Sequence, residues 1–279
     1  MTTTLLHGDC RARLRELPEG AYQSCITSPP YWEIIDYLPA DHPEKAAEIG
    51  HEVRPTDYIE AVVSVLREVR RVLTNDGTLW LNLGDKYAVK PGGNLAGGAQ
   101  STIAGRRVGR GTAARRLSSG RADRPPKSLL MLPARVAMAL QDDGWILRAE
   151  VIWAKPRFTP HPVVDRPTVA HEPLDLLAKS DRYTYAKEAI AERGTVWTVP
   201  PDGDSEHEAA MPPELARRCV LLTTKPGDRV VDPFGGRGTV ARVACELGRD
   251  ATSIDLDDRA VARARDYTDP RQLAFPGCA

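Results

Sequence analysis

The feature that most constrains the fold is an alternation of strand, loop, helix and strand near the end of the chain. Arg229–Asp232 has the apolar run of a buried strand, and Pro233–Gly238 has the glycines of a tight loop. Thr239–Leu247 has helical spacing, and Ala251–Asp255 is typical of a second strand. A helix between two such strands favours a parallel pair in one sheet. Loop glycines let the backbone approach a ligand, and the first N–H groups of the helix are free to bind it.

An acidic residue completes this pattern. Asp255 ends the second strand, 20 residues beyond Gly235, where a carboxylate can bind the hydroxyls of a ribose. No Gly-Lys-Ser/Thr follows the loop, which argues against a phosphate-cradling loop, and the glycines do not form G-x-G-x-x-G. The pattern predicts an adenosine-containing cofactor and leaves NAD and S-adenosylmethionine both open. The alternative is a glycine turn that only connects two elements.

The rest of the chain shows the same alternation. Apolar residues recur every three or four positions over Pro55–Leu73, which predicts an amphipathic helix. Further strands are expected at Thr4–Asp9, Tyr22–Thr27, Thr78–Leu83, Trp145–Trp153 and His171–Ala178, and further helices at Cys10–Leu17, Ser128–Gln141 and Pro212–Leu222. This order predicts an α/β fold with a mostly parallel sheet. A chain of 279 residues fits one domain.

One segment interrupts the alternation. Residues 86–127 contain eight glycines and ten basic residues against the single acid Asp123, a net charge of +9 in a chain whose total is zero. Such a segment buries too little apolar surface to order itself, so we expect a flexible loop. Its charge predicts a polyanionic partner, and a solvated loop without a partner is the alternative. If the loop does not bind DNA, 157–166 and 183–193 are the next candidates.

Composition excludes several classes of protein. The five cysteines form no C-x-x-C pair and no metal-ligand spacing with histidine, so we expect reduced thiols, no metal and a cytoplasmic protein. The first residues lack the basic start and apolar stretch of a signal peptide. No apolar run approaches the roughly 20 residues of a membrane span.

A second motif, Thr27–Trp32, directly follows an expected strand. Its two prolines fix φ and remove two N–H donors, so the turn is stiff and presents acceptors. A planar ligand with an amino group would donate to the Ser28 hydroxyl and the Pro29 carbonyl while its ring stacks on Tyr31. Taken alone, the same residues could simply end a strand.

Together the two motifs resemble those of the DNA amino-methyltransferase family. Ser28-Pro29-Pro30-Tyr31 is similar to its catalytic motif, Asp/Asn/Ser-Pro-Pro-Tyr/Phe/Trp, and Asp232–Thr239 to its cofactor motif, Asp-Pro-Phe-x-Gly-x-Gly-Thr. The catalytic motif comes first, which is the permuted order of the family's beta group. Shorter matches flank them, including 144–147, 151–156, 171–172 and 211–215. The resemblance implies a Rossmann-like, seven-stranded S-adenosylmethionine-dependent methyltransferase fold over 1–279, with the basic loop as an insertion.

The resemblance also implies site residues. It assigns the flipped base to Ser28, Pro29, Pro30 and Tyr31, and the cofactor to Asp9, Asp232, Pro233, Phe234, Gly235, Gly236, Gly238, Thr239 and Asp255. We expect DNA contacts from Trp32, Arg106, Arg107, Arg110, Arg115 and Arg116. Two positions depart from the motif: Arg237 replaces a small residue, and Val240 replaces a second threonine.

The expected reaction is direct transfer of a methyl group from S-adenosylmethionine to N4 of a flipped cytosine in double-stranded DNA. Ser28 at the first motif position favours cytosine, and N6 of adenine is the alternative. Other classes considered are an RNA or protein amino-methyltransferase and a non-catalytic DNA-binding module. We expect a monomer or weak dimer, with a cognate restriction endonuclease as a candidate partner.

Overall fold

The computed structural model describes residues 1–88, 123–157, 163–202 and 211–269. Their strands are β1 (Thr3–His7), β2 (Tyr22–Thr27), β3 (Leu73–Asn82), β4 (Ile146–Ala154), β5 (His171–Ala178), β6 (Val196–Thr198), β7 (Arg229–Asp232) and β8 (Asp250–Asp255). The helices are α1 (Cys10–Glu16), α2 (Pro55–Val72), α3 (Leu132–Asp142), α4 (Pro213–Thr223), α5 (Thr239–Glu246) and α6 (Asp258–Tyr267), with a short 3₁₀ helix, η1 (Lys45–Ala47).

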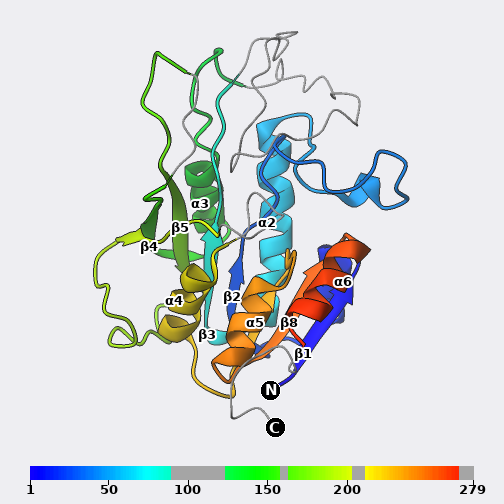
Figure 1. Cartoon of the computed structure of the whole chain (residues 1–279), viewed down its shortest axis with the longest axis vertical. Helices are drawn as coiled ribbons and strands as arrows, with labels where there is room; N and C mark the ends of the chain where they lie inside the picture. The colour runs from blue at the N-terminus through cyan, green and yellow to red at the C-terminus, as the bar shows by residue number, and fades with distance from the viewer. Residues whose placement is uncertain (89–122, 158–162, 203–210, 270–279) are drawn as a thin grey trace.

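The strands form one sheet in the order β1-β8-β7-β2-β3-β5-β4-β6. All neighbouring pairs are parallel except the two that involve β5, which runs against β3 and β4. The carboxyl ends of β1, β8, β7, β2, β3 and β4 therefore meet the amino end of β5 at one edge of the sheet. Figure 1 shows β2 and β3 pointing upward to this edge. Ligands of open α/β sheets bind at this edge.

Helices cover both faces of the sheet. Residues of α1, α2 and α3 pack into one hydrophobic cluster, and residues of α4 and α5 pack into another on the opposite face. In α2, Tyr58, Val62, Leu66 and Val69 are fully buried, which is the stripe that the helical spacing predicts. Each such side chain contributes roughly 1.5–3 kcal/mol to folding. Figure 1 shows α6 beside α5.

The predicted α/β fold with a mostly parallel sheet is confirmed. The sheet has one strand beyond the expected seven, because β6 pairs with β4 at its edge. β6 is three residues long and alternates exposed, buried and exposed side chains, so it leaves too short a pattern to recognise. α6 and η1 were not predicted either.

Two predicted boundaries were wrong for local reasons. The helix expected from Ser128 begins at Leu132, because Leu129 pairs with Tyr87 and Met131 takes a left-handed φ of 56°. The strand expected from Thr78 begins at Leu73, directly after α2, and its register with β2 shifts so that Tyr22 pairs with Leu73. Among the described helices, none has the length and apolar character to cross a bilayer.

Candidate functional site

The two motifs of the sequence meet at the carboxyl edge of the sheet. β2, which carries the catalytic motif, and β7, which carries the cofactor loop, are parallel neighbours. At their ends the Thr27 hydroxyl donates a hydrogen bond of 2.7 Å to the Asp232 carboxylate, across 205 residues of sequence. The strand order therefore joins the expected base site to the expected cofactor site.

The cofactor loop wraps around the end of β7 and is held to β8. The Phe234 N–H donates to Asp232 at 3.1 Å, and the Gly235 N–H donates to the Ile254 carbonyl at 2.8 Å. The Gly236 N–H donates to the Asp255 carboxylate at 2.8 Å. Hydrogen bonds from backbone N–H groups to the Asp232 and Asp255 carboxylates therefore hold the loop at two points.

The loop glycines have a packing reason as well. A Cβ on Gly235 would lie 1.7 Å from the Ser253 hydroxyl, so a larger residue would require Ser253 to move. Gly238 has a φ of +85°, and its Cβ would lie 3.1 Å from Ala264 Cβ in α6. Gly238 also starts α5 without a side-chain cap, which leaves the first N–H groups of that helix available to a ligand.

Three acids line this part of the edge. Burial raises the pKa of Asp232 to about 7, and burial also raises the pKa of Asp255. Both Asp255 oxygens accept backbone N–H groups, from Gly236 and Asp257, and each keeps a lone pair for a ribose hydroxyl. Asp9 follows β1, next to β8, where it caps α1 and pairs with Arg11 at 2.9 Å. Carboxylates beside uncapped N–H groups, Asp232 buried and Asp9 and Asp255 partly exposed, fit a cofactor with ribose hydroxyls and positive charge.

The side chain of Arg237, which departs from the motif, contacts three other side chains. Its guanidinium pairs with Asp202, donates to the Thr239 hydroxyl at 3.2 Å and lies 5.0 Å over the Tyr267 ring. Thr239 is buried at the start of α5, and Pro233 is also buried. Arg237 therefore ties the loop to the segment before α4 and to the end of α6.

The catalytic turn presents acceptors, as its sequence predicts. The Pro30 carbonyl accepts the Tyr58 hydroxyl at 2.8 Å, which anchors the turn to α2. In the part of the chain that the structure describes, no group donates a hydrogen bond to the Pro29 carbonyl. The Ser28 hydroxyl donates to the Asn82 side-chain carbonyl at 3.4 Å. Ser28 and Pro29 are therefore placed to accept from an amino group.

Tyr31 is held more tightly than a free stacking ring. Its side chain is 7% exposed, and burial raises the pKa of its phenol well above the usual value. The hydroxyl lies 2.8 Å from the Glu172 carboxylate and 3.3 Å from the Asn82 carbonyl oxygen. One side of the ring lies against Gly84, where a Cβ would approach Tyr31 Cε2 to 2.4 Å.

Three residues of this site were missed from the sequence. Asn82 ends β3, Glu172 lies at the start of β5, and Lys155 directly follows β4. The Asn82 amide donates to Glu172 at 3.3 Å, and Lys155 forms an ion pair with Glu172. The available signal was a polar residue at the end of an apolar strand, and the family-like elements 151–156 and 171–172, to which no role was given.

The expected DNA contact at Trp32 does not match the structure. Trp32 is 1% exposed, and its indole N–H donates to the Glu52 carbonyl at 3.0 Å. Lys86 Nζ lies 5.3 Å from the ring centroid. Trp32 is a core residue in this structure, because the loop that follows the motif folds over it.

The five expected DNA-binding arginines, Arg106, Arg107, Arg110, Arg115 and Arg116, lie outside the described residues. The two ends of the basic segment are described, and they pair with each other: the Ala88 N–H donates to the Ser128 carbonyl at 2.8 Å. The described end of the candidate segment 157–166 contacts these paired ends, since Arg166 lies 3.9 Å over the Tyr87 ring and Lys127 lies 2.5 Å from Asp165.

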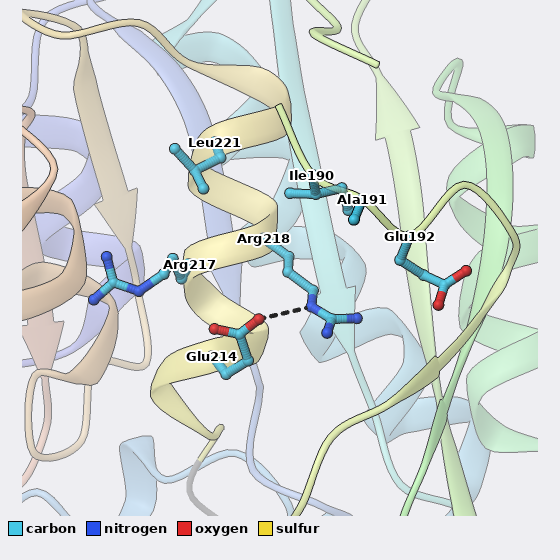
Figure 2. A pocket seen from close by; sticks show the side chains of 7 residues that line it. All are labelled: Ile190, Ala191, Glu192, Glu214, Arg217, Arg218 and Leu221. Carbon is cyan, nitrogen blue, oxygen red and sulfur yellow. Dashed lines mark hydrogen bonds and ion pairs between the residues drawn. The ribbon is translucent and has the colours of Figure 1, made fainter. Parts of the chain in front are cut away.

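The third candidate segment, 183–193, lies at the other end of the sheet. The Thr184 N–H donates to the Asp76 carbonyl near the amino end of β3, at 3.2 Å. A surface hollow next to this segment is lined by α4 and residues 190–192 (Figure 2). Its arginines are paired, Arg218 with Glu214 and Arg217 with Glu246, and it contains no residue of either motif. Neither segment 183–193 nor this hollow belongs to the site formed by the two motifs.

One three-residue group in the described chain has the composition of a metal site. Asp36, Glu48 and His51 bring ligand atoms within 4.8 Å of one another in the loop before α2. Lys45 Nζ lies 2.8 Å from Asp36 and 2.6 Å from Glu48, so an ammonium group already lies between the carboxylates. The four described cysteines, Cys10, Cys25, Cys219 and Cys245, are all buried and free.

Solved structures with the same fold are known. The chain superposes on the cytosine-N4-specific PvuII DNA methyltransferase with a TM-score of 0.70 and 17% identity, over 95% of this chain and 85% of that one. It superposes on a Thermus thermophilus protein solved with S-adenosyl-L-methionine with a TM-score of 0.66 and 22% identity, over 99% and 98% of the two chains. These similarities show the fold.

Sequence comparison is more specific. The chain is 40% identical to the Type II methyltransferase M.Cfr9I of Citrobacter freundii, over 92% of this chain and 85% of the relative. It is 37% identical to the Type II methyltransferase M.SmaI of Serratia marcescens, over 94% and 89%. The family model for DNA methylases of the N6/N4 type matches residues 22–266, which include both motifs. The chain therefore belongs to the N6/N4 DNA methylase family.

Proposed function

We propose that this DNA methylase transfers a methyl group from S-adenosylmethionine to the exocyclic N4 of a flipped cytosine. The observation that carries the proposal is the Thr27–Asp232 hydrogen bond of 2.7 Å, which holds the end of the amino-binding turn against the cofactor loop. The target nitrogen and the donor of its methyl group then lie on adjacent strand ends. In-line transfer requires this proximity.

The residues of the turn explain how a weak nucleophile is prepared. The lone pair of an aromatic amine is delocalised into the ring. Acceptance of both N–H bonds by Ser28 and Pro29 favours a pyramidal nitrogen whose lone pair points at the methyl carbon. Held by the cofactor loop and Asp255, S-adenosylmethionine would supply that carbon from a sulfonium centre and would leave as a neutral thioether, and the proton of the methylated nitrogen would pass to solvent.

Ser28 supports cytosine over adenine as the target. In the family motif a serine at this position is associated with N4 of cytosine and an aspartate with N6 of adenine. The PvuII enzyme, described as cytosine-N4-specific, has the same fold. N6-adenine methylation is the second candidate.

We further propose that double-stranded DNA lies across the carboxyl edge of the sheet and is contacted by the basic insertion. The paired ends of residues 86–127 follow the carboxyl end of β3, and Arg166 lies over the Tyr87 ring at this base of the insertion. The relatives M.Cfr9I and M.SmaI are Type II methyltransferases, which supports a role in a restriction–modification system with a cognate endonuclease. The enzyme would act as a monomer or weak dimer in the cytoplasm.

Product analysis tests the proposed base. Mixed-sequence DNA is incubated with the enzyme and S-adenosylmethionine, digested to nucleosides and examined by mass spectrometry, with Tyr31→Ala as the inactive control. N4-methylcytosine is the expected product. N6-methyladenine as the product would show that adenine, the second candidate, is the target, and unmethylated DNA would refute both candidates.

Salt dependence tests the proposed DNA surface. Changing Arg106, Arg107, Arg110, Arg115 and Arg116 to alanine should weaken DNA binding and flatten its dependence on salt, by about 0.9 in log–log slope for each phosphate that the variant no longer neutralises. A control with Arg148, Arg182 and Arg193 changed to alanine, near the opposite end of the sheet, should keep the original slope. An unchanged slope in the five-fold variant would remove the insertion from DNA binding.

A further inference from the structure

The loop between β2 and α2, residues 33–54, lies next to both halves of the site. It begins directly after the catalytic turn. Farther along the loop, the Ala47 carbonyl accepts a hydrogen bond of 3.0 Å from Arg11, the residue that pairs with Asp9. Figure 1 shows this loop, in blue, on the same side of the molecule as α6. The loop therefore connects the expected base site to the expected cofactor site.

Tyr37 lies where this loop meets α6. Its backbone N–H donates to the Glu48 carboxylate at 2.8 Å, and its carbonyl accepts from Arg259 Nη2 at 3.1 Å. Arg259 also pairs at 2.9 Å with Asp257, whose backbone N–H donates to the Asp255 carboxylate at 2.8 Å. This chain of contacts fixes the Tyr37 backbone close to the acid that is expected to bind the ribose.

The Tyr37 phenol is surrounded by protein and still meets solvent. The residue is 36% exposed, yet burial raises the pKa of its phenol above the usual value, and the nearby Asp255 and Glu48 raise it further. Burial also raises the pKa of Tyr31, and the proximity of Tyr37 adds to that effect. Such a group lies at the wall of a recess that a ligand can enter, between the ribose acid and the catalytic turn.

The hydroxyl of Tyr37 is a donor without a partner among the described residues, and no hydrogen bond joins it to Asp255. An ionised Asp255 offers only acceptors, and its two oxygens accept the backbone N–H groups of Gly236 and Asp257. A ribose hydroxyl is both a donor and an acceptor. Placed between the two side chains, it would donate to Asp255 and accept from Tyr37.

We propose that Tyr37 is a cofactor-binding residue whose hydroxyl donates a hydrogen bond to the ribose of S-adenosylmethionine, opposite Asp255. This rests on the proposed function, because that function assigns the ribose to Asp255. The backbone contacts to Glu48 and Arg259 hold position 37 without any help from the hydroxyl. A hydroxyl that only anchored the loop would need a protein partner, and the described part of the chain offers it none.

Calorimetry with the whole chain tests this contact in the absence of DNA. Tyr37→Phe keeps the ring and removes only the hydroxyl, so it should weaken S-adenosylmethionine binding roughly threefold to tenfold, as expected for one hydrogen bond. The Tm of the cofactor-free variant should stay at the wild-type value, because the hydroxyl has no protein partner. Tyr185→Phe is the matched control: Tyr185 is 46% exposed near the opposite end of the sheet, and its variant should keep wild-type affinity.

Two cofactor analogues assign the contact to the ribose. S-adenosylhomocysteine keeps the ribose but lacks the methyl group and the positive charge of the sulfur. Tyr37→Phe should weaken its binding by the same factor. A 2′,3′-dideoxyribose analogue of S-adenosylmethionine lacks the hydroxyl that would accept from Tyr37. Wild type and Tyr37→Phe should therefore bind this analogue equally well.

Wild-type affinity for S-adenosylmethionine in Tyr37→Phe would overturn the proposal, and so would a lower Tm of the cofactor-free variant. A loss confined to S-adenosylmethionine would also overturn it, because the phenol would then respond to the sulfonium charge. An equal loss with the dideoxy analogue would place the contact away from the ribose hydroxyls. Failure of the proposed function looks different: the wild-type enzyme would leave both cytosine N4 and adenine N6 unmethylated, whatever Tyr37→Phe does to cofactor binding.

Discussion

Replacing Asp232 with asparagine should stabilise the cofactor-free protein, and increasingly so as the pH rises. The Asp232 side chain is 5% exposed, and one of its oxygens accepts from Thr27 and from the Phe234 N–H. An asparagine carbonyl can accept the same two hydrogen bonds. The substitution removes only the negative charge of the carboxylate. That charge is unfavourable in the folded protein, since burial raises the pKa of Asp232 from 3.8 to about 7.

The size and sign follow from proton linkage. Between pH 4 and pH 7 the folded protein keeps a proton on Asp232 that the unfolded chain releases. Wild-type stability therefore falls as the pH rises through this window, by about 1.4 kcal/mol per pH unit for one such group. An asparagine at this position does not titrate, so the variant's advantage should grow by about 4 kcal/mol across the window and level off above pH 7.

Urea denaturation followed by circular dichroism at pH 5, 6, 7 and 8 measures this difference without cofactor. Asp175→Asn is the matched control, because burial, with the nearby Glu150, also raises the pKa of Asp175 to about 7. Both variants should show the same pH slope. S-adenosylmethionine carries positive charge, which favours a carboxylate at position 232. At saturation it should therefore make Asp232→Asn less stable than wild type, whereas Asp175→Asn should keep its gain in stability. A stability difference independent of pH in the Asp232 variant would refute the reasoning.

Three further substitutions test the packing of the site. Gly235→Ala should cost about 1–3 kcal/mol of stability and weaken S-adenosylmethionine binding in calorimetry, because its Cβ would lie 1.7 Å from the Ser253 hydroxyl; adding Ser253→Ala should restore much of the stability. Arg237→Ser should cost about 1 kcal/mol in thermal unfolding because it removes the Asp202 pair, with kcat at saturating cofactor unchanged. Trp32→Phe should cost about 1–3 kcal/mol, because it leaves a buried carbonyl without its donor, and should not alter the salt slope of DNA binding; a changed slope would make Trp32 a DNA contact.

Local sequence determined the elements and the two motifs. β2, β5 and β7 have the predicted bounds, because an apolar run between turn residues defines a strand without reference to the rest of the chain. The loop between β7 and α5 was equally readable, since its glycines and following acid lie within 20 residues. These signals depend on periodicity and turn chemistry, which act over a few positions.

Tertiary structure alone decided which of these pieces meet. Asn82, Glu172 and Lys155 come from β3, β5 and the end of β4, and they converge because β5 runs antiparallel between the other two. No spacing in the sequence indicates that order. Trp32 ends the motif Thr27–Trp32 and was expected to contact DNA, yet it is buried because the loop that follows covers it and offers a carbonyl to its indole. Contacts between distant segments depend on the strand order, which a local pattern does not contain.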